Sequence, residues 1–314
     1  MLTIQADAQV GSVSPYSRYG LGDLRFDGFA AQIGMGGVGA AYADSTTVNF
    51  YNPASLGGIA YTVFDAAGRA EIINLSNSMT SNWRNNSSFA YLSLAFPIAK
   101  GKWGAGFGLV PFSEKGYDLE DQVPLPGLGD VSFFFDGSGG LSRFYIGNGF
   151  TIGKNLSIGL NASYIFGSLN RSARVEFPDL TNVWNTRYNQ STSLGDFYFD
   201  YGIQYKMKLT KKNELVLGFT GVLKPEVNAV FDSYTYNYEK RGDVEIVKDT
   251  VQKTQDVNGS VTLPERWALG FSYRIGNNWQ IIGDYSWQDW SKYRSFSDID
   301  SLKNSYRFSA GAMY

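Results

Sequence analysis

The side chains in this sequence that could take part in chemistry are carboxylates, amines, guanidinium groups and hydroxyls, because the chain has neither histidine nor cysteine. The absence of histidine removes the commonest general base and metal ligand, so a serine–histidine arrangement for ester hydrolysis cannot form. The absence of cysteine excludes disulfides and thiolate chemistry. We therefore predict a protein that is not an enzyme and that uses no metal ion or other cofactor.

The charge of the chain narrows the range of partners. Its 27 basic and 29 acidic residues give a net charge of −2. A protein that binds nucleic acid needs a basic field to neutralise the phosphates, and this composition does not supply one. We predict no nucleic-acid partner.

Along parts of the sequence, aromatic or aliphatic residues alternate with charged, polar or small ones, so that the two kinds would lie on opposite faces of a strand. From Phe197 to Met207 every second residue is aromatic or aliphatic, while Asp200 and Gln204 lie on the other face of the same strand. Strands of about ten residues with one apolar face and one wet face are typical of transmembrane β-barrels. The same alternation appears in residues 156–166 and 266–275. We predict an all-β fold, a transmembrane antiparallel β-barrel.

This alternation predicts which side chains face lipid and which face the lumen. Phe197 and Leu269 should face lipid. In one interpretation, inward arginines and carboxylates fix an N-terminal plug and fill space. In the other, one or two arginines pair with a ligand carboxylate while apolar residues hold its tail. The candidate residues for ligand or plug contacts are Arg143, Asp200, Arg266, Arg274 and Arg307.

The alternation is absent before residue 59. Ala6-Asp7-Ala8 fits the small-x-small pattern before a signal-peptidase cut, so residues 1–8 are either a signal-peptide remnant or a chance match. Residues 9–58 are rich in glycine and alanine, yet they carry more aromatic and aliphatic side chains than a linker needs. This composition predicts a plug inside the lumen rather than a flexible periplasmic tail. Residues 59–314 are predicted to form the barrel.

The alternating segments predict about ten strands in this sequence. Short polar turns such as 153–155 join them at one end and long polar loops at the other, as in outer-membrane barrels with extracellular loops. The chain ends inside an alternating segment, so we expect further strands beyond it. The strands are expected at 59–75, 87–99, 102–115, 140–153, 155–175, 193–209, 213–234, 264–276, 278–290 and 303–314. The long loops are expected at 115–139, 176–192, 235–262 and 291–302.

Residues 34–59 resemble the end of the plug in the FadL family of outer-membrane transporters for hydrophobic compounds. A run rich in glycine and alanine is followed by Asn52, Pro53 and Ala54, directly before the first alternating segment. Pro53 fixes its φ angle and favours an extended conformation at Asn52, which suits a rigid corner between plug and first strand. A simple turn between loop and strand is the alternative.

Residues 102–120 resemble the third strand of the same family. Gly104, Gly106 and Gly108 should face the lumen, where the plug backbone can approach closely. Pro111 cannot donate a hydrogen bond to a neighbouring strand, so it needs an edge or a bulge. In the family a kink in this strand opens the wall sideways, and the resemblance implies such a lateral opening here. The alternative is a strand end that merely reaches its loop.

Residues 263–293 resemble the family's LP-x-x-W strand and the hairpin after it, which ends here in Asp289, Trp290 and Ser291. In the family further strands follow this segment. The resemblance therefore implies about fourteen strands in the complete protein and a truncated C-terminus in this sequence.

The resemblance implies a multi-pass barrel in the outer membrane of a Gram-negative bacterium. The expected function is passive transport of hydrophobic, fatty-acid-like molecules with lateral exit into the bilayer, so membrane lipid and a hydrophobic ligand are the expected partners. The N-terminal SPYSRYGLGDL departs from the better-known fatty-acid transporters and indicates a divergent branch. One branch, of the PorV type, serves in type IX secretion. The alternative function is therefore a non-transporting partner barrel, bound to another outer-membrane protein in a secretion or assembly complex.

Overall fold

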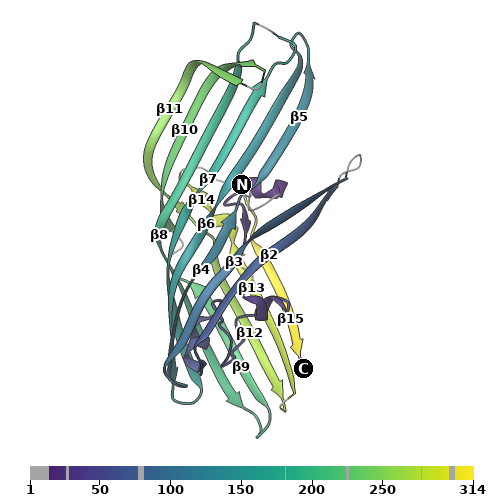
Figure 1. Ribbon diagram of the computed structural model, residues 1–314. Coiled ribbons are helices and arrows are strands. Elements are labelled where there is room, and N and C mark those ends of the chain that lie inside the picture. Colours follow the sequence, from purple (N-terminus) through teal and green to yellow (C-terminus); the bar gives the residue numbers. More distant parts are fainter. Residues whose placement is uncertain are drawn as a thin grey trace, which may run out of the picture.

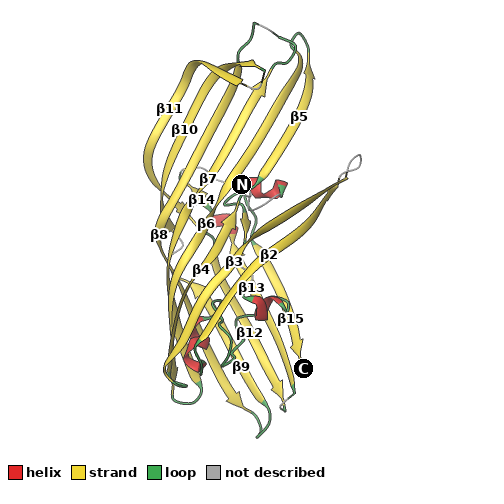
Figure 2. Ribbon diagram, in the orientation of Figure 1, coloured by secondary structure: helices red, strands yellow, loops and turns green. Residues whose placement is uncertain are grey.

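The computed structural model describes residues 14–25, 28–76, 81–180, 182–223, 226–242, 244–276, 278–296 and 301–314. The predicted signal-peptide remnant, residues 1–8, lies outside these ranges. The fold consists almost entirely of antiparallel strands with a few short helices (Figure 1, Figure 2). No helix in the described ranges is long and apolar enough to cross a membrane.

Most helices that the structure describes lie before residue 60, and every strand except the two-residue β1 lies from residue 63 onward. The N-terminal elements are η1 (Pro15–Arg18), β1 (Asp23–Leu24), α1 (Ala30–Ile33) and η2 (Pro53–Gly58). The later elements are β2 (Val63–Ser76), β3 (Ser81–Ala99), β4 (Trp103–Glu114), β5 (Tyr117–Leu125), β6 (Gly129–Ile152), β7 (Leu156–Glu176), β8 (Asn185–Lys208), β9 (Glu214–Val222), β10 (Glu226–Arg241), β11 (Val244–Thr262), β12 (Glu265–Ile275), β13 (Trp279–Asp289), η3 (Trp290–Lys292), β14 (Arg294–Ser295) and β15 (Ser305–Met313).

Three long strands run through both the lower and the upper part of the sheet (Figure 1). They are β6, β7 and β8, and β7 lies between the other two and pairs with both. On each side of this trio the neighbouring strand changes midway. Both β4 and β5 pair with β6, and both β9 and β10 pair with β8. The lower part has the order β15-β13-β12-β9-β8-β7-β6-β4-β3-β2, whereas β5, β10, β11 and β14 belong to the upper part. Among the described residues β2 and β15, the two ends of the lower order, do not pair with each other.

The lower order contains the predicted ten strands, but three of the predicted loops are wrong. The range 115–139 holds β5 and the start of β6, β8 begins within 176–192, and the β10–β11 hairpin occupies most of 235–262. These strands were missed because polar residues occupy both faces of the upper sheet, above all in β11, so that no apolar face repeats with a period of two. The predicted strand 213–234 is divided into β9 and β10.

Burial confirms the predicted orientation of the strands. Asp200 and Gln204 are 1% and 4% exposed, whereas Phe197 and Leu269 are 56% and 50% exposed. The face that carries Asp200 and Gln204 is called the inner face below. The outer face is apolar and exposed, as lipid contact requires.

Candidate functional site

Residues 28–59, called the inner segment below, lie against the inner face of the sheet. Its helix η2 contacts β4, β6, β7 and β8. Aromatic rings connect the segment to the wall. The ring centres of Phe29 and Tyr91 are 4.1 Å apart, and those of Phe50 and Tyr145 are 4.3 Å apart. The inner segment therefore occupies space between strands that are far apart in the sequence.

Asn52 fixes the corner at which the inner segment turns into η2. It is completely buried, and its Oδ1 accepts a hydrogen bond from Ala54 N at 3.1 Å. Pro53 follows at the first helical position, where a missing N–H costs nothing. The Asn52 Nδ2 donates to Ala40 O at 2.5 Å and to Phe219 O of β9 at 3.3 Å. One side chain thus caps η2 and joins it to the wall.

A row of glycines allows this close approach. The row consists of direct neighbours across β4, β6, β7 and β8, namely Gly104, Gly149, Gly159 and Gly202. A Cβ atom at Gly159 would overlap the backbone of Pro53, and one at Gly202 would overlap the Asn52 side chain. Any larger residue in this row would push η2 away from the wall.

The three glycines predicted to face the lumen in β4 have different neighbours. A Cβ at Gly104 would overlap the carbonyl oxygen of Leu56 in η2, so this glycine approaches the inner segment. Cβ atoms at Gly106 and Gly108 would instead meet backbone carbonyls of β3. The prediction that the inner segment approaches all three glycines is therefore wrong for Gly106 and Gly108.

Polar side chains of the wall bind the backbone of the inner segment. Asn161 of β7 donates to Phe50 O at 2.9 Å, and Thr220 of β9 donates to Tyr51 O at 3.0 Å. Gln204 of β8 donates to two further carbonyls of the segment, each at 3.2 Å. These contacts satisfy carbonyl groups that would otherwise be buried without a partner.

Asp284 of β13 also binds the backbone of the inner segment. Its Oδ2 accepts hydrogen bonds from Gly39 N at 2.5 Å and from Ala40 N at 2.8 Å. Asp284 of β13 and Gln204 of β8 therefore bind the same short stretch of the segment around Ala40.

Three of the predicted inward residues form one cluster. Asp200 accepts from Arg143 at 3.2 Å and from Arg266 at 2.9 Å, and its side chain is 1% exposed. The Arg143 guanidinium lies 4.7 Å from the ring centre of Phe50, and that of Arg266 lies 4.8 Å from the ring of Tyr51. Two cations and one carboxylate thus surround aromatic residues of the inner segment.

The other two predicted arginines lie outside this cluster. Arg307 of β15 donates to Gly37 O at 3.5 Å. Arg274 is opposite Glu214 near the lower end of β12, eight residues beyond Arg266 on the same strand. The structure therefore does not bring the five candidates together in one ligand site.

The wall is interrupted beside β4. The strands β3 and β4 pair only as far as Leu92 and Leu109, and the β2–β3 hairpin then turns away from β4 (Figure 1). On the other side of β4, its register with β6 shifts between Pro111 and Ser113. The predicted proline thus lies at an irregularity next to an opening between β3 and β4.

Residues from the N-terminal part occupy this opening. β1 pairs with the edge of β4, so that Leu24 is opposite Ser113. The Arg25 guanidinium lies 2.7 Å from a carboxylate oxygen of Glu114 in β4 and 3.0 Å from one of Glu71 in β2. Arg25 therefore links both sides of the opening.

Apolar side chains fill the lumen above the inner segment. Leu21 belongs to a buried cluster with residues of β6, β7, β8, β10 and β11: Leu141, Ile165, Leu169, Leu194, Val227 and Val261. A cavity of about 70 Å³ remains beside Leu21, lined in part by Lys115 and Thr192. Lys115 is buried and donates from Nζ to Gly20 O at 3.2 Å.

Sequence reasoning missed Arg25, Lys115 and Thr220. The alternation of β9 places Thr220 on the inner face, so its orientation was available from the sequence, but its partner was not. Arg25 precedes the alternating segments and Lys115 is the last residue of the predicted strand 102–115. Their partners Glu114 and Gly20 are 89 and 95 residues away in the sequence. No local pattern indicates such contacts.

The comparisons with known proteins agree with this architecture. The crystal structure of a Pseudomonas aeruginosa FadL homologue is similar with a TM-score of 0.53 at 11% identity, and the match covers 92% of this chain and 77% of that one. No curated protein gives a significant match. The fold is thus that of a FadL-like outer-membrane β-barrel. The family is also clear: the BamG family model matches residues 1–314, so the chain belongs to the BamG family.

Proposed function

We propose that this protein is a non-transporting partner barrel in an outer-membrane assembly complex, without enzymatic activity. The observation that carries the proposal is the way in which the lumen is filled. Strands β7, β8, β9 and β13 each bind the backbone of the inner segment through a side chain. The inner segment acts here as a permanent plug, because moving it would leave several buried polar groups without partners.

The size and lining of the upper cavities support the same proposal. Pockets for small molecules usually enclose roughly 300–1,000 Å³. The cavity beside Leu21 measures about 70 Å³, which holds a few water molecules but no fatty-acid chain. A second, more open pocket of about 560 Å³ lies among the upper strands, but polar and charged side chains such as Asp118, Asn170 and Arg171 line most of it, so it does not suit an apolar chain. The name of the BamG family also points to an assembly complex of the outer membrane.

The proposal is tested by measuring assembly and uptake separately in the same cells. Depletion of the protein should lower the amounts of other folded outer-membrane barrels, detected as heat-modifiable bands, and should leave the uptake of a fluorescent fatty acid unchanged. Thr192→Leu adds apolar volume to the cavity beside Leu21. When it is expressed in the depleted cells, this variant should restore assembly as fully as the wild-type protein does. The proposal fails if depletion abolishes uptake while assembly continues.

One observation favours the second candidate, a passive transporter of hydrophobic molecules with lateral exit. The opening between β3 and β4 lies beside Pro111, where such an exit would be needed. In this arrangement Arg25 must release Glu114 or Glu71 before a ligand can pass into the bilayer. Lipid found by mass spectrometry inside the purified wild-type barrel would favour this candidate.

A further inference from the structure

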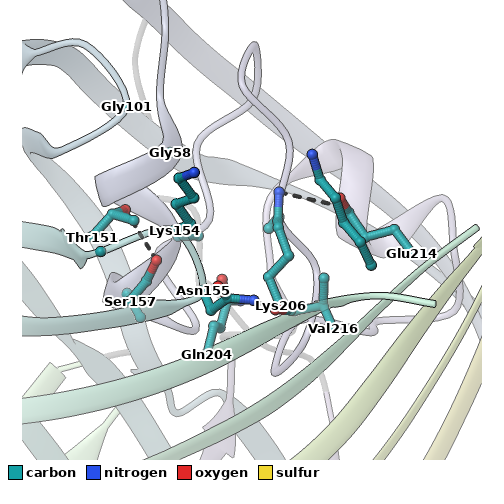
Figure 3. A pocket seen from close by; sticks show the side chains of 15 residues that line it. Gly58, Gly101, Thr151, Lys154, Asn155, Ser157, Gln204, Lys206, Glu214 and Val216 are labelled. Atoms are coloured by element: carbon teal, nitrogen blue, oxygen red, sulfur yellow. Dashed lines mark hydrogen bonds and ion pairs between the residues drawn. The ribbon is translucent and has the colours of Figure 1, made fainter. Parts of the chain in front are cut away.

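The lower end of the barrel has a pocket that the filled lumen does not explain. It has a volume of about 750 Å³ and lies between the short turns and the inner segment (Figure 3). Ala54, Ser55 and Gly58 of the inner segment line it on one side, and Gly101 and Lys154 of two hairpin turns line it on another. Because the buried inner segment forms one side, the pocket receives a ligand but does not lead through the barrel.

The charges around this pocket are almost all positive. Lys154, Lys206 and Lys208 line it, and Glu214 is the acidic residue among its lining residues. Lys206 is 3.3 Å from Glu214, so this pair is neutral. Within the described part of the chain, no carboxylate forms an ion pair with the other two lysines. Figure 3 shows Lys154 and Lys206 extending on either side of Asn155.

The hairpin turns beside the pocket extend this positive charge. The three hairpin ends at 99–103, 152–156 and 204–216 contain one acidic residue, Glu214. Their basic residues are Lys100, Lys102, Lys154, Lys206, Lys208, Lys211 and Lys212. A net positive field over this end attracts anionic partners, although the protein as a whole is slightly acidic.

The position of the pocket favours a polypeptide over lipid. The side chain of Gln204 lies on the inner face and is 4% exposed, whereas its neighbour Tyr205 is 46% exposed on the outer face. Lys206 and Lys208 follow Gln204 with a period of two and therefore share its face. Lipid head groups surround the outer face of a barrel, so the pocket opens toward the periplasm rather than toward lipid.

We propose that this pocket binds an acidic, extended segment of a periplasmic partner protein. The inference rests on the proposed function and adds the chemistry of the contact. The pocket lysines come from two hairpins, and their spacing suits a chain that carries several carboxylates, because each carboxylate meets a separate ammonium group. Asn155 donates from Nδ2 to Lys206 O, and its Oδ1 can accept a hydrogen bond from a backbone N–H of such a segment.

The test measures binding of a fluorescent decaglutamate peptide to the detergent-purified protein by fluorescence anisotropy. Wild-type protein should bind the peptide and lose affinity as salt increases. The double variant Lys154→Gln/Lys208→Gln should bind about ten-fold more weakly, because each exposed ion pair contributes a factor of up to about five. Lys211→Gln/Lys212→Gln removes the same charge from the tip of the β8–β9 hairpin, outside the lining of the pocket, and should weaken binding less than two-fold.

Each outcome decides the proposal. Equal loss in the two double variants, or no binding by the wild type, overturns it. Displacement of the peptide by equimolar phosphatidylglycerol in the micelle identifies a lipid head-group site and also overturns it. The assembly assay in depleted cells keeps the two proposals distinct: if assembly depends on the protein but the peptide does not bind, only the acidic-segment inference fails.

Discussion

Replacing Asp200 by asparagine tests whether the buried charge cluster holds the barrel and the inner segment together. Asp200 accepts from both Arg143 and Arg266, and the side chains of Arg143 and Asp200 are 2% and 1% exposed. The variant keeps the size of the side chain but leaves the buried guanidinium of Arg143 and the largely buried one of Arg266, 13% exposed, without their shared carboxylate. Breaking a buried pair in this way costs about 3–5 kcal/mol. We expect Asp200→Asn to lower the free energy of unfolding by roughly that amount.

The assay is urea-induced unfolding of the protein in lipid vesicles, followed by tryptophan fluorescence. Because the cost arises from uncompensated cations, Asp200→Asn should be less harmful after Arg143 has been replaced by methionine. The double-mutant cycle should therefore give a coupling of about 1–3 kcal/mol. A cost below about 1 kcal/mol, or the same cost in both backgrounds, would refute the role assigned to this cluster.

Three further predictions concern the lipid face, the glycine row and the opening beside β4. Leu269→Arg should lower the free energy of unfolding in vesicles by about 2–4 kcal/mol, whereas Leu269→Phe should change it little. Gly159→Ala should destabilise the protein by roughly 1–3 kcal/mol. Gly68→Ala serves as the control and should be nearly neutral, because a Cβ at Gly68 meets its nearest neighbour at 3.8 Å. Equal effects of the two substitutions would contradict the close approach of η2 to the wall. Arg25→Gln should speed tryptic cleavage near the N-terminus at least several-fold without altering the unfolding midpoint of the barrel, and unchanged cleavage would show that the contacts with Glu114 do not hold this segment.

The sequence was sufficient for the orientation of the lower strands, because one face must suit lipid and the other must not. Asp200 and Leu269 were placed on the correct faces by the period of two alone. The same rule failed for β5, the second half of β10 and β11, because polar residues occur on both faces of these strands and no apolar face repeats with a period of two. Lipid contact, rather than strand formation, is what the alternation detects.

The partners of the inward residues were beyond the reach of the sequence. Arg143, Asp200 and Arg266 were named together, yet their meeting depends on how β6, β8 and β12 curve around the inner segment. Arg307 was named in the same set and instead donates to a backbone carbonyl of that segment. The sequence predicts which side chains point inward. It does not predict which of them contact one another, because such contacts depend on packing between strands that are distant in the chain.

Transport and a scaffold role make opposite demands on the inner segment. A transporter needs a segment that moves between two arrangements of similar free energy, so few strong contacts should hold it in place. Here glycines on four adjacent strands bring η2 against the wall, and Asn52 joins its corner to β9. Each such contact favours a single arrangement and raises the free energy of any other. A barrel whose interior is fixed in this way leaves its ends and its flank beside β4 as the surfaces with which it can act on other molecules.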